Sequence, residues 1–196
     1  MSRLMRTSEV AQRPVVTLDG EDVAQIKDVV FSADGGAVEG FTLAGRGRFS
    51  GPLRSMLPWS SILALGRDAV MILDAQALAS ESEAFGSSGT PGSRNNVLGS
   101  QVLTDSGIDL GTITDVILQV SENDDRGCEV VGYEIESSET LGDKGTTMLI
   151  PLPNTVAVSG QHLIVPASTR DFVRNDLAGF GAAVEEYRSQ LEGRVR

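Results

Sequence analysis

Side chains able to do acid–base or metal chemistry are scarce in this sequence. One histidine, His162, and one cysteine, Cys128, are present among 196 residues. A structural zinc site needs four ligands, and this pair cannot complete one. We expect His162 to lie at the start of a strand and Cys128 to be buried, with redox sensing by Cys128 as the alternative. The sequence predicts no catalytic residue, no metal and no cofactor.

Two pairs of aspartates recur at matching places along the chain and raise the question of paired-carboxylate catalysis. Asp22 matches Asp109, and Asp28 matches Asp115. Each lies beside a predicted turn, where an aspartate commonly accepts hydrogen bonds from backbone amides. We therefore predict structural roles for all four. The acidic residues 122–125 lack the glycine and the final glutamate of a calcium loop, so we expect a solvated loop there.

A stretch rich in glycine and arginine, residues 45–51, has the composition to bind an anionic group. Its spacing is neither that of a dinucleotide site nor that of a phosphate-binding loop, and no helix follows it. We interpret it as a hairpin loop whose Arg46, Arg48 and nearby Arg54 bind an acidic partner. The corresponding stretch later in the chain, residues 136–143, is acidic. This difference predicts that the two halves have divided their tasks, or attract each other or a second subunit.

An internal repeat organises these residues. Residues 10–31 align without gaps to residues 97–118, an offset of 87, and eight of the 22 positions are identical. The offset becomes 92 at Gly40 and Gly132, and 93 at Pro58 and Pro151. The order of the matches is kept, and the extra residues fall in polar loops. The chain is therefore a tandem duplication.

Each copy has the pattern of short β-strands separated by turns. Apolar and β-branched runs alternate with glycine turns at the spacing of a small closed barrel. We predict a mainly β fold with two tandem small β-barrels, each followed by a helical segment. The predicted divisions are a first barrel at residues 1–74, a helical segment and Gly/Ser linker at 75–94, a second barrel at 95–167, and a C-terminal helix at 168–196.

Both predicted helical segments carry sequence signals. Asp74 has the residue type of an N-cap for the Ala/Glu-rich residues 74–85. In the last segment apolar residues recur at alternating spacings of four and three, a heptad-like stripe formed by Val173, Leu177, Phe180, Val184, Tyr187 and Leu191. Such a stripe slightly favours a homodimer over a monomer.

The motif at residues 107–117 reads Gly-x-x-Leu-Gly-x-Ile-x-Asp-Val-Ile, and a Val-x-Gly-Tyr strand and an Ile-Pro segment follow it. This pattern resembles the PRC-barrel domain, found in the photosynthetic reaction-centre H subunit and in the C-terminal half of the ribosome maturation factor. The first copy fits except that Ala24 replaces the second glycine. The resemblance covers residues 8–74 and 95–167, and it implies a docking module without catalytic activity. The H subunit also has a transmembrane helix, and the maturation factor has a different N-terminal barrel; this sequence shows neither. We therefore expect neither a reaction-centre role nor a role in ribosome maturation.

Charge and composition exclude several classes of partner. The formal net charge is −11, which argues against direct binding to nucleic acid or to an anionic membrane surface. One cysteine allows no disulfide within the chain. No apolar run approaches the roughly 20 residues of a membrane span, and the first residues do not read as a signal peptide. We expect a cytoplasmic protein.

These observations predict a non-enzymatic adaptor or assembly protein that binds a protein partner. The predicted partner surface comprises Arg46, Arg48, Arg54, Trp59, Phe180, Val184 and Tyr187. A barrel of about 70 residues is short of core, so we also expect the two barrels to pack on one another or on a second subunit. The alternative hypothesis is a small-molecule or ion sensor with its ligand between the two barrels.

Overall fold

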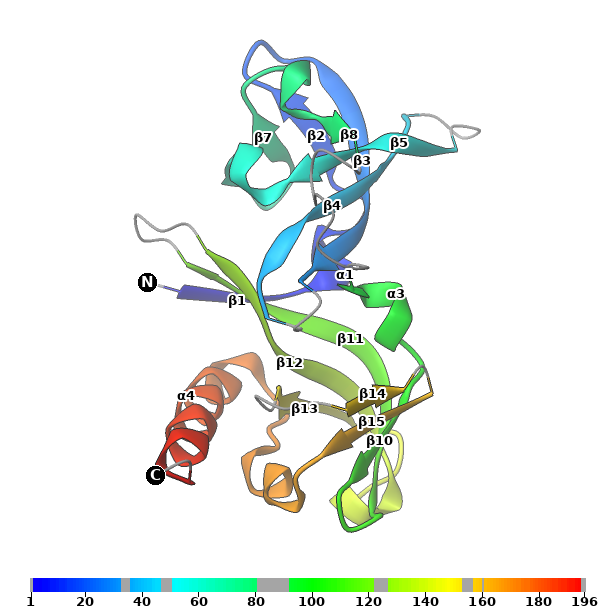
Figure 1. The fold of residues 1–196 in the computed structure, drawn as a ribbon, viewed down its shortest axis with the longest axis vertical. Helices are drawn as coiled ribbons and strands as arrows, with labels where there is room; N and C mark the ends of the chain where they lie inside the picture. Colours follow the sequence, from blue (N-terminus) through cyan, green and yellow to red (C-terminus); the bar gives the residue numbers. More distant parts are fainter. Residues whose placement is uncertain are drawn as a thin grey trace.

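The computed structural model describes residues 2–32, 36–46, 51–80, 92–121, 127–152, 157–159 and 161–194. The fold is mainly β, with one sheet built around each half of the chain and a helix at the C-terminal end (Figure 1). The first domain lies above the second along the long axis of the molecule. The mainly β fold and the two-domain arrangement predicted from the sequence are confirmed.

The first domain holds seven strands of its own in the order β6-β7-β2-β3-β4-β5-β8. Strands β2 and β7 pair in parallel, and the other neighbours on this path pair antiparallel. The strands are β2 (Pro14–Thr17), β3 (Asp22–Phe31), β4 (Val38–Ala44), β5 (Pro52–Pro58), β6 (Ile62–Leu65), β7 (Val70–Ile72) and β8 (Ala79–Ser80). Two short 3₁₀ turns, η1 (Trp59–Ser61) and η2 (Ala75–Ala77), connect parts of this sheet.

The second domain repeats this arrangement in the order β13-β12-β11-β10-β15-β14. Here β10 and β15 form the parallel pair. The strands are β10 (Gln101–Thr104), β11 (Asp109–Ser121), β12 (Cys128–Ser137), β13 (Thr147–Pro151), β14 (Ala157–Ser159) and β15 (His162–Val165). After them come η4 (Ala167–Phe172) and the helix α4 (Leu177–Arg194), and η3 (Glu139–Leu141) lies between β12 and β13.

Each domain sends a short N-terminal arm to the other domain. The first arm, β1 (Ser2–Arg6) and α1 (Thr7–Val10), lies against the second domain, where β1 pairs with β11. The second arm, β9 (Gly92–Ser93) and α3 (Arg94–Val97), lies against the first domain, where β9 pairs with β3. The expected packing of one barrel on the other is therefore confirmed. Residues 2–6, which the sequence assigned to the first barrel, belong to the second sheet, and α1 after them lies against β11.

The two domains are related by an approximate twofold axis. Arg6 lies opposite Ile117, and Ser93 lies opposite Val30. Ser93 is equivalent to Arg6 and Ile117 is equivalent to Val30, each at the repeat offset of 87. The same pairing is therefore made twice, once in each direction between the domains. Near the axis an antiparallel bridge joins Ala37 directly to Glu129, two equivalent positions at the offset of 92. Equivalent parts of the two domains consequently meet near the axis and are separated from each other far from it.

Several positions that are identical in the two copies form the same turn twice. The backbone N–H of Glu21 donates to Oγ1 of Thr17 at 3.0 Å, and that of Ile108 donates to Oγ1 of Thr104 at 3.0 Å. Gly20 and Gly107, inside these turns, have φ of 91° and 78°, which favours glycine. These identities therefore reflect turn geometry.

The segment after the first barrel is less helical than predicted. Asp74 does act as an N-cap, because its Oδ1 accepts a hydrogen bond from the N–H of Gln76 at 2.8 Å. Only one 3₁₀ turn follows, and Leu78 leads directly into β8, which pairs with β5. The rest of the predicted segment, residues 81–85, lies outside the described residues.

Candidate partner-binding surface

The predicted basic surface is formed in part by the hairpin between β4 and β5. Arg46 and Arg54 are exposed, and Leu53, which precedes Arg54 in β5, is 39% exposed. Arg46 forms an ion pair with Asp22 at the start of β3. Arg48 lies outside the described residues. In Figure 1, β5 runs sideways from the first domain, across the long axis of the molecule.

The acidic counterpart of this hairpin lies at the other end of the molecule (Figure 1). Glu136, Glu139 and Asp143 are exposed around η3. The two loops belong to different domains and do not lie side by side, so they do not hold the two barrels together within this chain. The attraction of either loop to a second subunit stays a prediction.

Trp59 is half-buried at the start of η1. Its ring packs at a tilt of 53° on the ring of Phe41, with 6.2 Å between centroids. Phe41 belongs to the core, and Trp59 packs against that core from outside. Trp59 thus supports the barrel and leaves part of its ring accessible.

The three predicted contact residues on the C-terminal helix are not accessible. Phe180, Val184 and Tyr187 are no more than 2% exposed. Phe180 and Val184 pack on the second sheet, and Tyr187 packs on Phe172 with its hydroxyl 2.9 Å from Oγ1 of Thr169. The prediction that these residues bind a partner is wrong, because the apolar stripe of α4 covers the second domain of its own chain.

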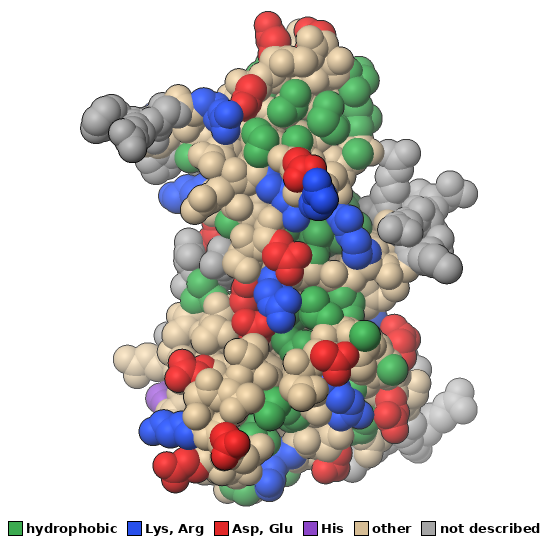
Figure 2. Space-filling view, turned by 180° about the vertical axis from the view of Figure 1, so that it is seen from behind, with side chains coloured by type: hydrophobic (Ala, Val, Ile, Leu, Met, Phe, Trp, Pro, Cys, Tyr) green, Lys and Arg blue, Asp and Glu red, His purple; other side chains and the backbone are tan. Residues whose placement is uncertain are grey.

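Sequence reasoning missed a group of exposed leucines on the first domain. Leu18 and Leu73 are each 60% exposed and are adjacent, since the N–H of Leu18 donates to the carbonyl of Leu73 at 3.3 Å. Leu63, on the neighbouring strand β6, is 41% exposed. Figure 2 shows hydrophobic side chains grouped over the first domain. Thr17 and Ile72 are buried, and the leucine that follows each of them is exposed. Because neighbouring residues of a strand face opposite sides, this alternation was the signal available in the sequence.

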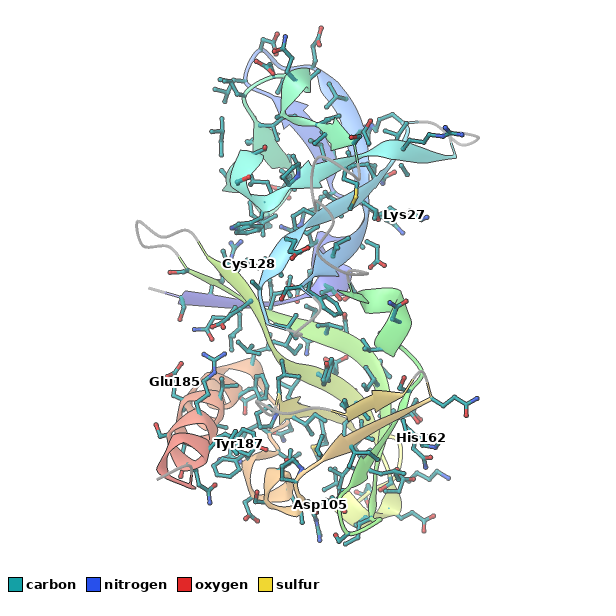
Figure 3. The ribbon with its side chains drawn as sticks, viewed as in Figure 1. Lys27, Asp105, Cys128, His162, Glu185 and Tyr187 are labelled. Atoms are coloured by element: carbon teal, nitrogen blue, oxygen red, sulfur yellow. The ribbon has the colours of Figure 1, made fainter. Side chains whose placement is uncertain are left out.

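The two side chains that could act in acid–base or metal chemistry, those of Cys128 and His162, lie on different strands and apart from each other. Cys128 is buried at the start of β12, and His162 lies at the start of β15 (Figure 3). Burial raises the pKa of the Cys128 thiol to about 12, so this thiol is protonated at neutral pH. No group of three metal-ligating side chains occurs within the described parts of the chain.

The two buried aspartates that recur in the repeat, Asp28 and Asp115, accept hydrogen bonds from backbone amides. Oδ1 of Asp28 accepts from the N–H of Val29 at 2.9 Å, and Oδ1 of Asp115 accepts from Val116 at 2.8 Å. Asp115 also accepts from Oγ1 of Thr7 at 2.5 Å, on the first arm. These carboxylates anchor elements, as the sequence predicted, and one of them anchors the arm of the other domain.

A groove of about 680 Å³ lies between β1 and α4. Its lining includes Leu4 and Gln119 on the sheet and Gly181 and Glu185 on the helix.

Among the described helices none is long and apolar enough to cross a membrane.

Comparison with known protein families gives one match. The model of the PRC-barrel domain matches the chain twice, over residues 3–78 and 93–171. The two matches agree with the two copies of the repeat and with the two sheets. No curated protein matches the chain.

Proposed function

Because the chain belongs to the PRC-barrel family, with one such domain in each half, we propose that it is a non-enzymatic adaptor or assembly protein. It binds a partner protein that presents an acidic surface. The observation that carries this proposal is the β4–β5 hairpin, where Arg46, Leu53 and Arg54 are all exposed. Its counterpart in the second domain has the opposite charge, so the basic hairpin is a property of one domain only.

The hairpin combines two features of protein-binding surfaces. Exposed guanidinium groups attract carboxylates over several ångströms and speed the encounter with an acidic partner. The exposed Leu53 on the same hairpin supplies apolar area that is covered on binding. A partner carboxylate would join or replace Asp22 at Arg46. We keep Trp59 as a second contact, through the accessible part of its ring.

A pull-down from the native cell tests this function. The double variant Arg46→Glu/Arg54→Glu should lose a protein that the wild type captures, and raising the salt concentration should weaken the wild-type capture. Arg67→Glu is the matched control, because Arg67 is exposed on the same domain in the β6–β7 turn. Purified partner should then bind the wild type and the control with equal affinity. Equal capture by all three proteins would place the binding surface elsewhere.

Small-molecule or ion sensing remains the second hypothesis. We rank it lower because, within the described residues, apolar side chains from both domains and both arms form one continuous core at the junction, including Val10, Val97, Ile26 and Ile113. A ligand-dependent rise in melting temperature in a metabolite and ion screen would favour the sensor. The cytoplasmic location is likewise a prediction, and cell fractionation tests it.

A further inference from the structure

The first arm is attached to the second domain by specific contacts. Nε of Arg6 donates to Oε2 of Glu134 at 2.5 Å, and this hydrogen bond raises the pKa of Arg6. Oγ1 of Thr7 donates to buried Asp115, and the N–H of Ser8 lies 3.3 Å from both oxygens of that carboxylate. Met5 is buried in the shared core. The arm therefore docks through a strand, a charge pair and a capped helical turn.

The second arm repeats, on the first domain, the strand pairing and the buried apolar residue of the first arm. Its strand β9 pairs with the part of β3 that corresponds to the part of β11 paired with β1. Val97, at the end of α3, is buried in the same core as Val10, at the end of α1. Each domain thus gives an arm and receives one across a twofold axis. This is the geometry of a homodimer with exchanged arms, made here by two domains of one chain.

Nothing in these contacts requires the two domains to belong to the same chain. The only covalent connection between them, from Ser80 of β8 to Gly92 of β9, is the eleven residues 81–91. At about 3.3–3.6 Å per residue, such a segment reaches up to roughly 36–40 Å when extended. It includes Gly86, Gly89 and two serines between them, a composition typical of flexible linkers.

We propose that the first domain of one copy also pairs with the second domain of another copy through these same arm contacts, giving a domain-swapped dimer. The occupant of each arm-docking edge is then the arm of a second copy of this chain. This inference is independent of the proposed adaptor function, because it uses the arm edges and not the β4–β5 hairpin. It also replaces the dimer that the stripe on α4 suggested.

The balance between the two forms is set by concentration, because both make the same contacts. Within one chain, a connection of only eleven residues gives each domain an effective concentration for the other in the millimolar range. Dilute protein is therefore monomeric, and chains that refold together at about 1 mM populate the swapped dimer.

Cysteine cross-linking between copies tests the swap. Ser2 of β1 lies opposite Ser121 of β11 in the antiparallel pair. In a Cys128→Ala background, Ser2→Cys and Ser121→Cys chains are mixed, unfolded in guanidinium, refolded together at about 1 mM and oxidised. The expected product is a disulfide-linked heterodimer, which light scattering measures at about twice the 20.7 kDa of the chain.

Two controls make the result decisive. The double variant Ser2→Cys/Ser121→Cys in one chain, refolded dilute, should form its disulfide within the chain and so verifies the register. Ser60→Cys replaces Ser2→Cys in the background control, because Ser60 is exposed on the first domain and takes no part in the pairing of β1 or β9. The proposal is overturned if the heterodimer does not exceed this background, or if the double variant fails to close its own disulfide.

Discussion

At the scale of single residues, the repeat contains a natural comparison at the end of each arm. Gln12 and Gly99 occupy equivalent positions and adopt φ of 70° and 81°. The N–H of Gln12 donates to Ile26, and that of Gly99 donates to Ile113, both at 2.9 Å. The two arms therefore end in the same left-handed backbone conformation, which Gly99 tolerates and in which Gln12 is strained.

We predict that Gln12→Gly raises the free energy of unfolding by about 0.5–1 kcal/mol, because glycine relieves the left-handed strain. The matched change Gly99→Ala should lower it by about 1 kcal/mol. A Cβ at Gly99 would meet no atom within 4 Å, so only the backbone conformation is penalised. Urea denaturation measures both. A loss of stability in Gln12→Gly would contradict the assignment of strain.

Cys128 should make the protein less stable in alkali. Its thiol has a pKa of about 12 in the folded state, against about 9 when unfolded. The unfolded chain therefore releases this proton first, so stability is full below pH 9 and falls as the pH rises toward 12, by up to about 1.4 kcal/mol per pH unit. Tyr133, whose pKa burial also raises to about 12, adds to the fall above pH 10.

Cys128→Ala tests the contribution of the thiol. Urea denaturation at pH 8 and pH 9.5 should show a smaller alkaline loss in the variant than in the wild type. The folded wild type should also resist thiol reagents at neutral pH. An equal alkaline loss in both proteins would show that Cys128 does not contribute.

At the scale of elements, α4 packs closely on the second sheet where the ring of Phe180 lies over Gly132. A Cβ added to Gly132 of β12 would lie 2.6 Å from Cζ of Phe180. The absence of a side chain at Gly132 therefore makes room for the Phe180 ring. Gly132 and Gly40, its equivalent in the first domain, also share a second constraint, because a Cβ at either would meet the backbone carbonyl of the neighbouring strand, that of Ile150 or that of Leu57.

Phe180→Ala should lower the free energy of unfolding of the isolated chain by about 3–5 kcal/mol, the usual cost of removing a buried phenylalanine. Glu186→Ala, on the exposed side of the same helix, is the control and should have little effect. Thermal or urea denaturation distinguishes the two. Unchanged stability of Phe180→Ala would mean that the ring is not part of the core.

The elements that could be predicted from the sequence are those specified by nearby residues. Thr17, Gly20 and their equivalents determine a turn over a few positions, so the strands and the duplication were predictable. The apolar stripe of α4 gave the buried side of the helix but not what it contacts, and the partner assignment of Phe180 failed for that reason. The destination of β1 depends on β11, more than 100 residues away, and no local pattern encodes that pairing.

At the scale of the whole molecule, one core is shared by both domains and both arms. We predict that the protein unfolds in a single transition, with equal calorimetric and van't Hoff enthalpies in scanning calorimetry. Asp115→Ala should lower the temperature of this single transition without splitting it, because the arm that Asp115 holds belongs to the other domain. Two separate transitions would show that the domains are independent.

The crossing arms also set an order for events on the ribosome. When the first barrel has been synthesised, the edge of β3 that receives β9 is still unpaired, and it stays so until Gly92–Ser93 leaves the exit tunnel. Strand β1, translated before the other described strands, has no strand to join until β11 exists. It is therefore among the last of these strands to reach its final place.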